Sequence, residues 1–189
     1  MATRIAVRLA CLVAAIIVST EAAAEPIPPA YEFAAQRAGV PAAVLYVVAV
    51  QESGMPLHHR LIPWPWTLNI AGVPERFLNR AEACHALTRA LLSLPATRVD
   101  AGLGQISVGY QGARVANPCA LLDPYRNLAV TATILREHHT PGDDWLIAIG
   151  RYHRPAGGSP AEEYRRSVQA HWKRIVSPSG PTRMDDDYR

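Results

Sequence analysis

One carboxylate stands at the end of the most apolar stretch that follows the N-terminal region. Glu52 comes after a run of alanine, valine, leucine and tyrosine residues over 42–50. If this run is a helix, Leu45 and Val48 lie on the face of Glu52, so its carboxyl group ends an apolar stripe. Burial and the negative end of a helix dipole both disfavour the charged form and raise the pKa. Such a group suits a general acid near neutral pH. The alternative is a helix-end glutamate that reaches solvent.

A second candidate segment, residues 100–107, reads Asp-Ala-Gly-Leu-Gly-Gln-Ile-Ser. Gly102 and Gly104 flank Leu103 in an extended pattern, and glycine there is typical of places where another group approaches the backbone closely. Gln105 offers both a donor and an acceptor. These groups suit a sugar, which is bound by uncharged hydrogen bonds. An ordinary turn is the competing interpretation.

Aromatic residues outside the apolar runs favour the same ligand class. Trp66 and Tyr110 stand in segments rich in proline or glycine, and Tyr152 follows an apolar helical run. Rings with an apolar face and a polar edge suit stacking on sugars. Core packing is the alternative for each ring.

The cysteine spacing predicts a disulfide. Of the three cysteines, Cys11 lies in the N-terminal apolar run, which leaves Cys84 and Cys119 as a pair. In an oxidising compartment such a pair forms a disulfide, worth about 3–4 kcal/mol for a loop of this size. The alternative is a catalytic thiol, but the neighbouring His85 would not face Cys84 on a helix. We expect no metal site, because the histidine pairs at 58–59 and 138–139 are adjacent and not four residues apart.

Positioning these residues requires a mainly α (α+β) domain built around one buried helix. An all-round apolar segment is typical of a buried central helix. A small β element would carry the glycine segment, and 55–74 would form a loop rich in proline and tryptophan. The expected helices are 31–38, 41–52, 74–94, 128–138, 143–152 and 160–175, and the expected extended segments are 66–70 and 98–108.

Composition and the N-terminus suggest an exported protein. The 189 residues carry a net charge of +3 and are 49% hydrophobic. These values exclude a disordered chain and argue against nucleic acid as a partner. Residues 1–24 carry Arg4 and Arg8, an apolar run over 9–18 and an alanine cleavage site, which together predict a signal peptide cut after Ala24. The alternative is an uncleaved anchor. We expect a periplasmic or secreted monomer with one catalytic domain over 25–176, a disordered tail over 177–189 and no stable membrane anchor.

Taken in chain order, these residues resemble the soluble lytic transglycosylase domain, which is related to goose-type lysozyme. The resemblance covers roughly 30–175. Its motifs are Glu52-Ser53, the Gly-Leu-Gly-Gln of 102–105, the Ala-Ile-Gly-Arg-Tyr-His of 148–153, and Tyr164 with Val168. Gly104 stands where family members often have methionine, and His153 where the usual motif has asparagine. The Pro-Trp-Pro-Trp-Thr-Leu-Asn of 63–69 resembles members associated with conjugation, pilus or secretion systems.

The resemblance implies a lysozyme-like fold and cleavage of the β-1,4 bond between N-acetylmuramic acid and N-acetylglucosamine in peptidoglycan. Glu52 would protonate the leaving oxygen and then act as base on the muramic C6 hydroxyl, which closes a 1,6-anhydro ring. No metal or organic cofactor is implied. The partners would be glycan strands and an envelope conjugation or secretion apparatus. The substrate-binding residues would be Ser53, Gly102, Leu103, Gly104, Gln105, Tyr152 and Tyr164. Among them, Ser53 and Gln105 would bind sugar or orient Glu52, and Tyr152 would support the carboxylate or the transition state. Trp66 and Tyr110 join this set as the aromatic candidates named above.

Two other functions stay open. A hydrolytic muramidase would need a second carboxylate to activate water, and Asp100, beside the glycine segment, is the candidate. A non-catalytic protein that binds peptidoglycan within an envelope machine is the candidate from another class.

Overall fold

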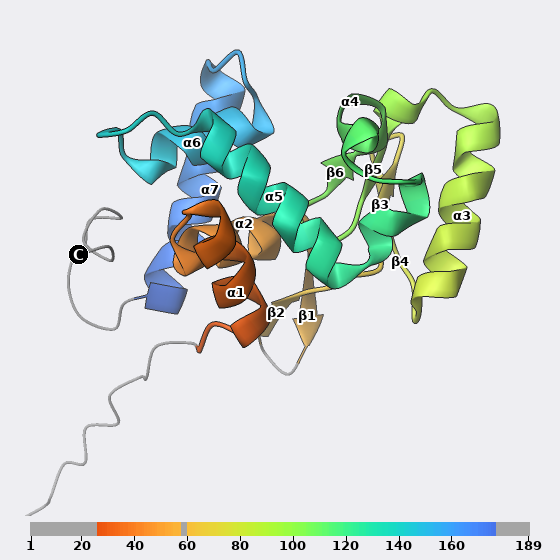
Figure 1. Ribbon diagram of the computed structural model, residues 1–189, viewed down its shortest axis with the longest axis horizontal. Helices are drawn as coiled ribbons and strands as arrows, with labels where there is room; N and C mark the ends of the chain where they lie inside the picture. The colour runs from red at the N-terminus through yellow and green to blue at the C-terminus, as the bar shows by residue number, and fades with distance from the viewer. Residues whose placement is uncertain (1–25, 58–59, 177–189) are drawn as a thin grey trace, which may run out of the picture.

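The computed structural model describes residues 26–57 and 60–176, and this part of the chain is mainly helical with a small β component (Figure 1). The predicted fold class, mainly α with one small β region, is confirmed at this level. The expected signal peptide and C-terminal tail lie outside the described residues. The helices are α1 (Pro29–Ala38), α2 (Ala42–Ser53), α3 (Arg80–Ser93), α4 (Val108–Gln111), α5 (Pro124–His138), α6 (Trp145–His153) and α7 (Ser159–Val176). The strands are β1 (Gly54–Leu57), β2 (Arg60–Pro63), β3 (Thr67–Ile70), β4 (Val73–Arg76), β5 (Val99–Ala101) and β6 (Ile106–Ser107). Short 3₁₀ turns cover η1 (Ala96–Arg98), η2 (Gly112–Arg114) and η3 (Pro118–Leu122).

Helix α2 is the buried central helix that the apolar run predicts. Gly39 ends α1 in the left-handed conformation with φ of 66°, and Pro41 precedes the first turn of α2. Every residue from Ala43 to Val50 is buried, so the helix is covered on all sides. Among the described residues no single helix is long and apolar enough to cross a membrane.

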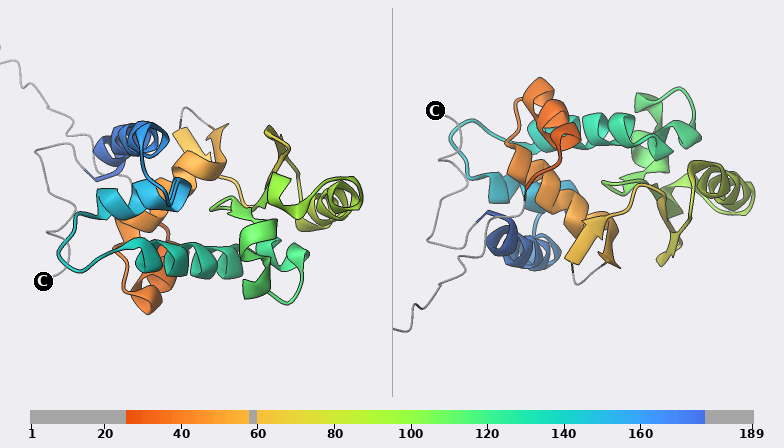
Figure 2. Two further views of the ribbon diagram at one scale, coloured as in Figure 1. Left: turned by 90° about the horizontal axis from the view of Figure 1, so that it is seen from above. Right: turned by 90° about the horizontal axis from the view of Figure 1, so that it is seen from below.

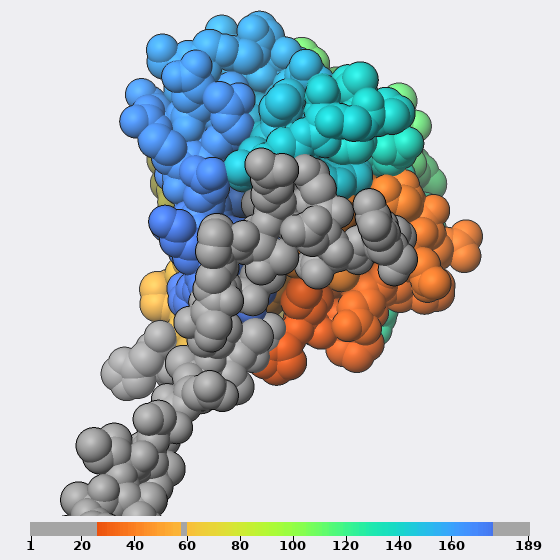
Figure 3. Space-filling view, turned by 90° about the vertical axis from the view of Figure 1, so that its left-hand side faces the viewer, coloured from red at the N-terminus to blue at the C-terminus, as the bar shows by residue number. Residues whose placement is uncertain are grey.

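Two hydrophobic cores lie side by side, and helix α5 belongs to both. The larger core joins α1, α2, α6 and α7, and the smaller core joins α3 to the sheet. Leu128 and Leu135 of α5 face the larger core, whereas Val130 and Ile134 face the smaller one. Figure 2 shows α5 running from the helical side to the sheet side in both views. On the end of the molecule formed by the larger core, α7, the α5–α6 connection and α1 make up the surface (Figure 3).

The four-stranded antiparallel sheet has the order β4-β3-β5-β6 and carries the glycine segment at its end. The predicted extended segment 66–70 is confirmed as β3. The helix expected from residue 74 begins only at Arg80, because Val73–Arg76 pair with β3 as an edge strand, where Pro74 is tolerated. Asn79 then caps α3 by accepting a hydrogen bond from the Glu82 amide at 2.9 Å.

The stretch expected as a loop after α2 contains an antiparallel pair, β1 with β2.

The predicted disulfide is confirmed: Cys84 of α3 is bonded to Cys119 of η3, with the Cα atoms 5.2 Å apart. It fixes α3 to the segment that leads into α5.

Candidate functional site

A cleft of about 800 Å³ lies between the two cores and contains the carboxylate that the sequence singles out. Its walls come from the end of α2, from β3, β5, β6 and α4, and from the last turns of α5 and α6. Most of the residues that line it have polar side chains. The lining consists of Glu52, Thr67, Asn69, Pro74, Thr97, Asp100, Gln105, Ile106, Ser107, Tyr110, Gln111, Ile134, His138, Tyr152, His153, Arg154, Pro155 and Ala156.

Glu52 and Tyr164 form the central pair of the site. The hydroxyl of Tyr164, on α7, donates a hydrogen bond of 2.5 Å to Oε1 of Glu52. Glu52 is half-buried at the cleft wall, and Tyr164 is only 7% exposed. Burial raises the pKa of Glu52 to about 7, although the hydrogen bond from Tyr164 acts in the opposite direction. At neutral pH this carboxyl group can therefore both give and take a proton.

Asp100 lies in the same cleft, on the sheet. It pairs with Asn69 of β3 on one side and with Ser107 of β6 on the other. Burial raises the pKa of Asp100 as well. Its negative charge adds to the rise in the pKa of Glu52.

Tyr152 joins the two cores and bonds the glycine segment. Its hydroxyl donates a hydrogen bond of 2.5 Å to the carbonyl oxygen of Gly104. Burial and the nearby charge of Glu52 raise the pKa of Tyr152 well above its usual value, so the hydroxyl stays protonated. A Cβ atom on Gly104 would lie 2.8 Å from this hydroxyl oxygen and would overlap the hydroxyl of Thr131. Glycine is therefore required at 104 for close approach.

Asn127 holds the turn 102–105, and sequence reasoning missed it. Its buried side chain accepts a hydrogen bond from the Gly104 amide at 2.8 Å. It donates to the carbonyl oxygens of Ala101 at 2.9 Å and Leu121 at 2.8 Å. Gly102, with φ of 82°, leaves room for this amide. The only signal in the sequence is the spacing of Asn127 and Thr131, which are four residues apart and so share one face of helix α5.

Gln105 lines the cleft, and the NH₂ group of its side chain is already hydrogen-bonded within the protein. The backbone there has φ of 47°, and the side-chain nitrogen donates to the carbonyl oxygens of Gly102 at 2.8 Å and Thr67 at 3.1 Å. These bonds fix the side chain and leave its amide oxygen to a ligand.

Five expected binding residues are buried and do not line the cleft: Ser53, Gly102, Leu103, Gly104 and Tyr164. Ser53 is fully buried, and its hydroxyl contacts the carbonyl oxygen of Leu103 at 2.8 Å and that of Ala49 at 3.0 Å. Leu103 belongs to the larger core, and Gly102 is buried against Asn127. The structure therefore gives these residues contacts that position Glu52 and Gln105.

The expected aromatic residues divide in the same way. Tyr110 lines the cleft and is 76% exposed. Trp66 packs against the smaller core and meets Trp64 edge-on at 5.7 Å, so it does not line the cleft. The indole nitrogen of Trp66 is buried and has no partner among the described residues.

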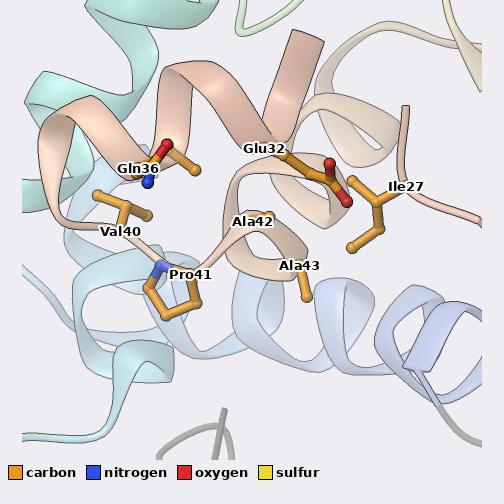
Figure 4. A pocket seen from close by; sticks show the side chains of 8 residues that line it. Ile27, Glu32, Gln36, Val40, Pro41, Ala42 and Ala43 are labelled. Atoms are coloured by element: carbon orange, nitrogen blue, oxygen red, sulfur yellow. The ribbon is translucent and has the colours of Figure 1, made fainter. Parts of the chain in front are cut away.

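A second hollow, of about 350 Å³, lies between α1 and the start of α2 and shares no lining residue with the cleft. Figure 4 shows its one carboxylate, Glu32, beside Ile27. Within residues 26–57 and 60–176, no group of three or more His, Cys, Asp or Glu side chains is placed to hold a metal ion.

Comparisons of the chain with protein-family models, with curated proteins and with solved structures gave no match.

Proposed function

We propose that this protein is a peptidoglycan lytic transglycosylase with a lysozyme-like arrangement of its helices and small sheet. The observation that carries the proposal is Glu52, a carboxyl group with a pKa of about 7 that faces the cleft and accepts a hydrogen bond from Tyr164. A glycan strand is bound mainly by hydrogen bonds and stacking, which Asn69, Gln105 and Tyr110 of the cleft can supply.

In the proposed reaction Glu52 acts twice. Its protonated form gives the proton to the glycosidic oxygen as the bond between C1 of N-acetylmuramic acid and that oxygen breaks. The resulting carboxylate takes the proton of the C6 hydroxyl, whose oxygen forms the new bond to C1. The product ends in 1,6-anhydro-N-acetylmuramic acid, no water is consumed, and Glu52 is protonated again. A pKa near 7 suits both steps.

Tyr164 and Tyr152 support this reaction through their hydrogen bonds. Tyr164 donates to Glu52 and stabilises its charged form after the first proton transfer. Tyr152 fixes Gly104 and thereby the turn that carries Gln105. An exported protein would meet this substrate in the periplasm or outside the cell, and an envelope conjugation or secretion apparatus is the proposed partner.

The test is digestion of purified sacculi, with the soluble muropeptides measured by mass spectrometry. Wild-type protein should release products with 1,6-anhydromuramic acid ends, which are one water lighter than hydrolytic products. Glu52→Gln should release at least about 100-fold less. Equal digestion by Glu52→Gln would remove the proposed mechanism, and sacculus binding without soluble products would support the non-catalytic alternative.

A hydrolytic muramidase is the second candidate, because Asp100 lines the same cleft as Glu52. It requires Asp100 to activate water. Reducing-end products, together with loss of activity in Asp100→Asn, would replace the first proposal with this one.

A further inference from the structure

His153 lies in the cleft and against the central pair of the site. It is the last residue of α6, and its ring lies parallel to that of Tyr164, with the centroids 4.5 Å apart and an angle of 3° between the planes. His153 also lines the cleft, and its side chain is exposed there. His153 therefore covers one face of the Tyr164 ring, and His153 itself is exposed to solvent in the cleft.

The contact continues to the reacting group. Tyr164 donates from its hydroxyl to Glu52, so His153, Tyr164 and Glu52 form a chain from the cleft surface to the carboxyl group. These residues come from α6, α7 and α2, and only their packing brings them together. A ring stacked on Tyr164 restricts its rotation and excludes water from one side of the hydrogen bond.

We propose that His153 is a positioning residue for the reaction: its ring covers Tyr164 and holds the Tyr164 hydroxyl on Glu52. The inference rests on the proposed function for its effect on turnover. The effect of His153 on the pKa of Glu52 can be measured without any substrate.

The groups around His153, Tyr164 and Glu52 favour a neutral His153 ring at neutral pH. Burial and the neighbouring Arg154 lower the pKa of His153, so the ring is neutral above about pH 6.5. Glu52 is also faced by Asp100 from the sheet, by Tyr152 from α6 and by Tyr164 from α7. Burial is the largest cause of the raised Glu52 pKa, so a change that admits water should lower it.

The substrate-free experiment is a ¹³C NMR titration of protein labelled at the glutamate carboxyl carbons, with Glu52→Gln used for assignment. In His153→Ala the pKa of Glu52 should fall by about one unit, because the carboxyl group becomes more exposed to water. In His153→Phe, which preserves the stacked ring, the pKa should stay near the wild-type value. His85→Ala, which removes an exposed histidine on α3, is the matched control for the loss of a histidine.

The turnover experiment uses the same variants on sacculi. His153→Ala should lower kcat at pH 7 about tenfold and move the alkaline limb of the pH profile by the shift seen in the titration. His153→Phe should restore most of the activity. An increase in KM with an unchanged Glu52 pKa in His153→Ala would overturn the proposal, because it would assign His153 to substrate contact alone. Absence of any product from wild-type protein would instead count against the proposed function and would leave the titration as the test of the coupling.

Discussion

The hydroxyl of Ser53 bonds the carbonyl oxygen of Leu103 at 2.8 Å, which ties the end of α2 to the glycine turn. The contact joins residues fifty positions apart in the chain, and it is completely buried. Glu52 and Gln105 each lie next to one end of this contact, so their separation depends on it.

Ser53→Ala should therefore affect both stability and rate. It leaves the buried Leu103 carbonyl oxygen without its partner, which costs about 1–3 kcal/mol of unfolding free energy. Urea unfolding measures this loss. Ser167→Ala, which removes an exposed hydroxyl on α7, is the control and should cost less than about 0.5 kcal/mol. Equal losses in the two variants would show that the Ser53 contact does not stabilise the fold.

Tyr164→Phe should move the pH dependence in the direction opposite to His153→Ala. The Tyr164 hydroxyl lowers the pKa of Glu52, so its removal should raise that pKa above about 7. Since the general acid must be protonated, the alkaline limb of the kcat profile should move to higher pH. The stacking with His153 is preserved in phenylalanine. A shift to lower pH would contradict the role given to this hydrogen bond.

The stability of the protein should fall as pH rises from about 4.5 to about 7. The folded state keeps Glu52 protonated in this window, whereas the unfolded chain, with the ordinary value of 4.5, has lost the proton. The folded state thus binds more protons, and its free energy of unfolding decreases with pH by at most about 3 kcal/mol.

Glu52→Gln isolates this effect. It should be more stable than wild type at pH 8 and nearly equal to it at pH 4, as measured by thermal or urea unfolding at both values. Glu162→Gln, which changes an exposed carboxylate on α7, is the matched control for the replacement of glutamate by glutamine at both pH values. A wild-type advantage at pH 8 would contradict the burial of a charged Glu52.

Gly104→Ala tests the close approach at the turn. The new Cβ atom would overlap the hydroxyl of Thr131 and crowd that of Tyr152, which should cost about 1–3 kcal/mol of stability and displace Gln105. Gly112→Ala is the matched control, because a Cβ atom there meets open space and φ is −59°. Sacculus digestion should fall in Gly104→Ala alone. Full activity in a stable Gly104→Ala variant would show that the reaction does not depend on the geometry of this turn.

The local pattern of the sequence was sufficient for the central helix and its carboxylate. An apolar run with proline before it and glycine after it determines α2, and the position of Glu52 at its end follows from helix geometry. The pairing of Cys84 with Cys119 also followed from counting, once the N-terminal cysteine was set aside.

Long-range packing decided the features that the sequence did not show. Val73–Arg76 lie in β4 because β3 offers a partner, and neither the turn nor the strand has a strong local signal. The burial of Asn127 and the stacking of His153 on Tyr164 depend on which helix faces meet. For the same reason the sequence alone does not show that Ser53 and Leu103 are buried and do not line the cleft.

Helix α5 has a consequence for how the cleft receives a ligand. Since opposite faces of this one rigid rod complete the two cores, the walls that carry Glu52 and Asp100 cannot move apart without bending it or breaking a core. A long polymer would therefore enter the cleft from the side, and the width of the cleft would stay fixed. Selection among strands would depend on what each sugar unit carries, and not on a closing movement of the protein.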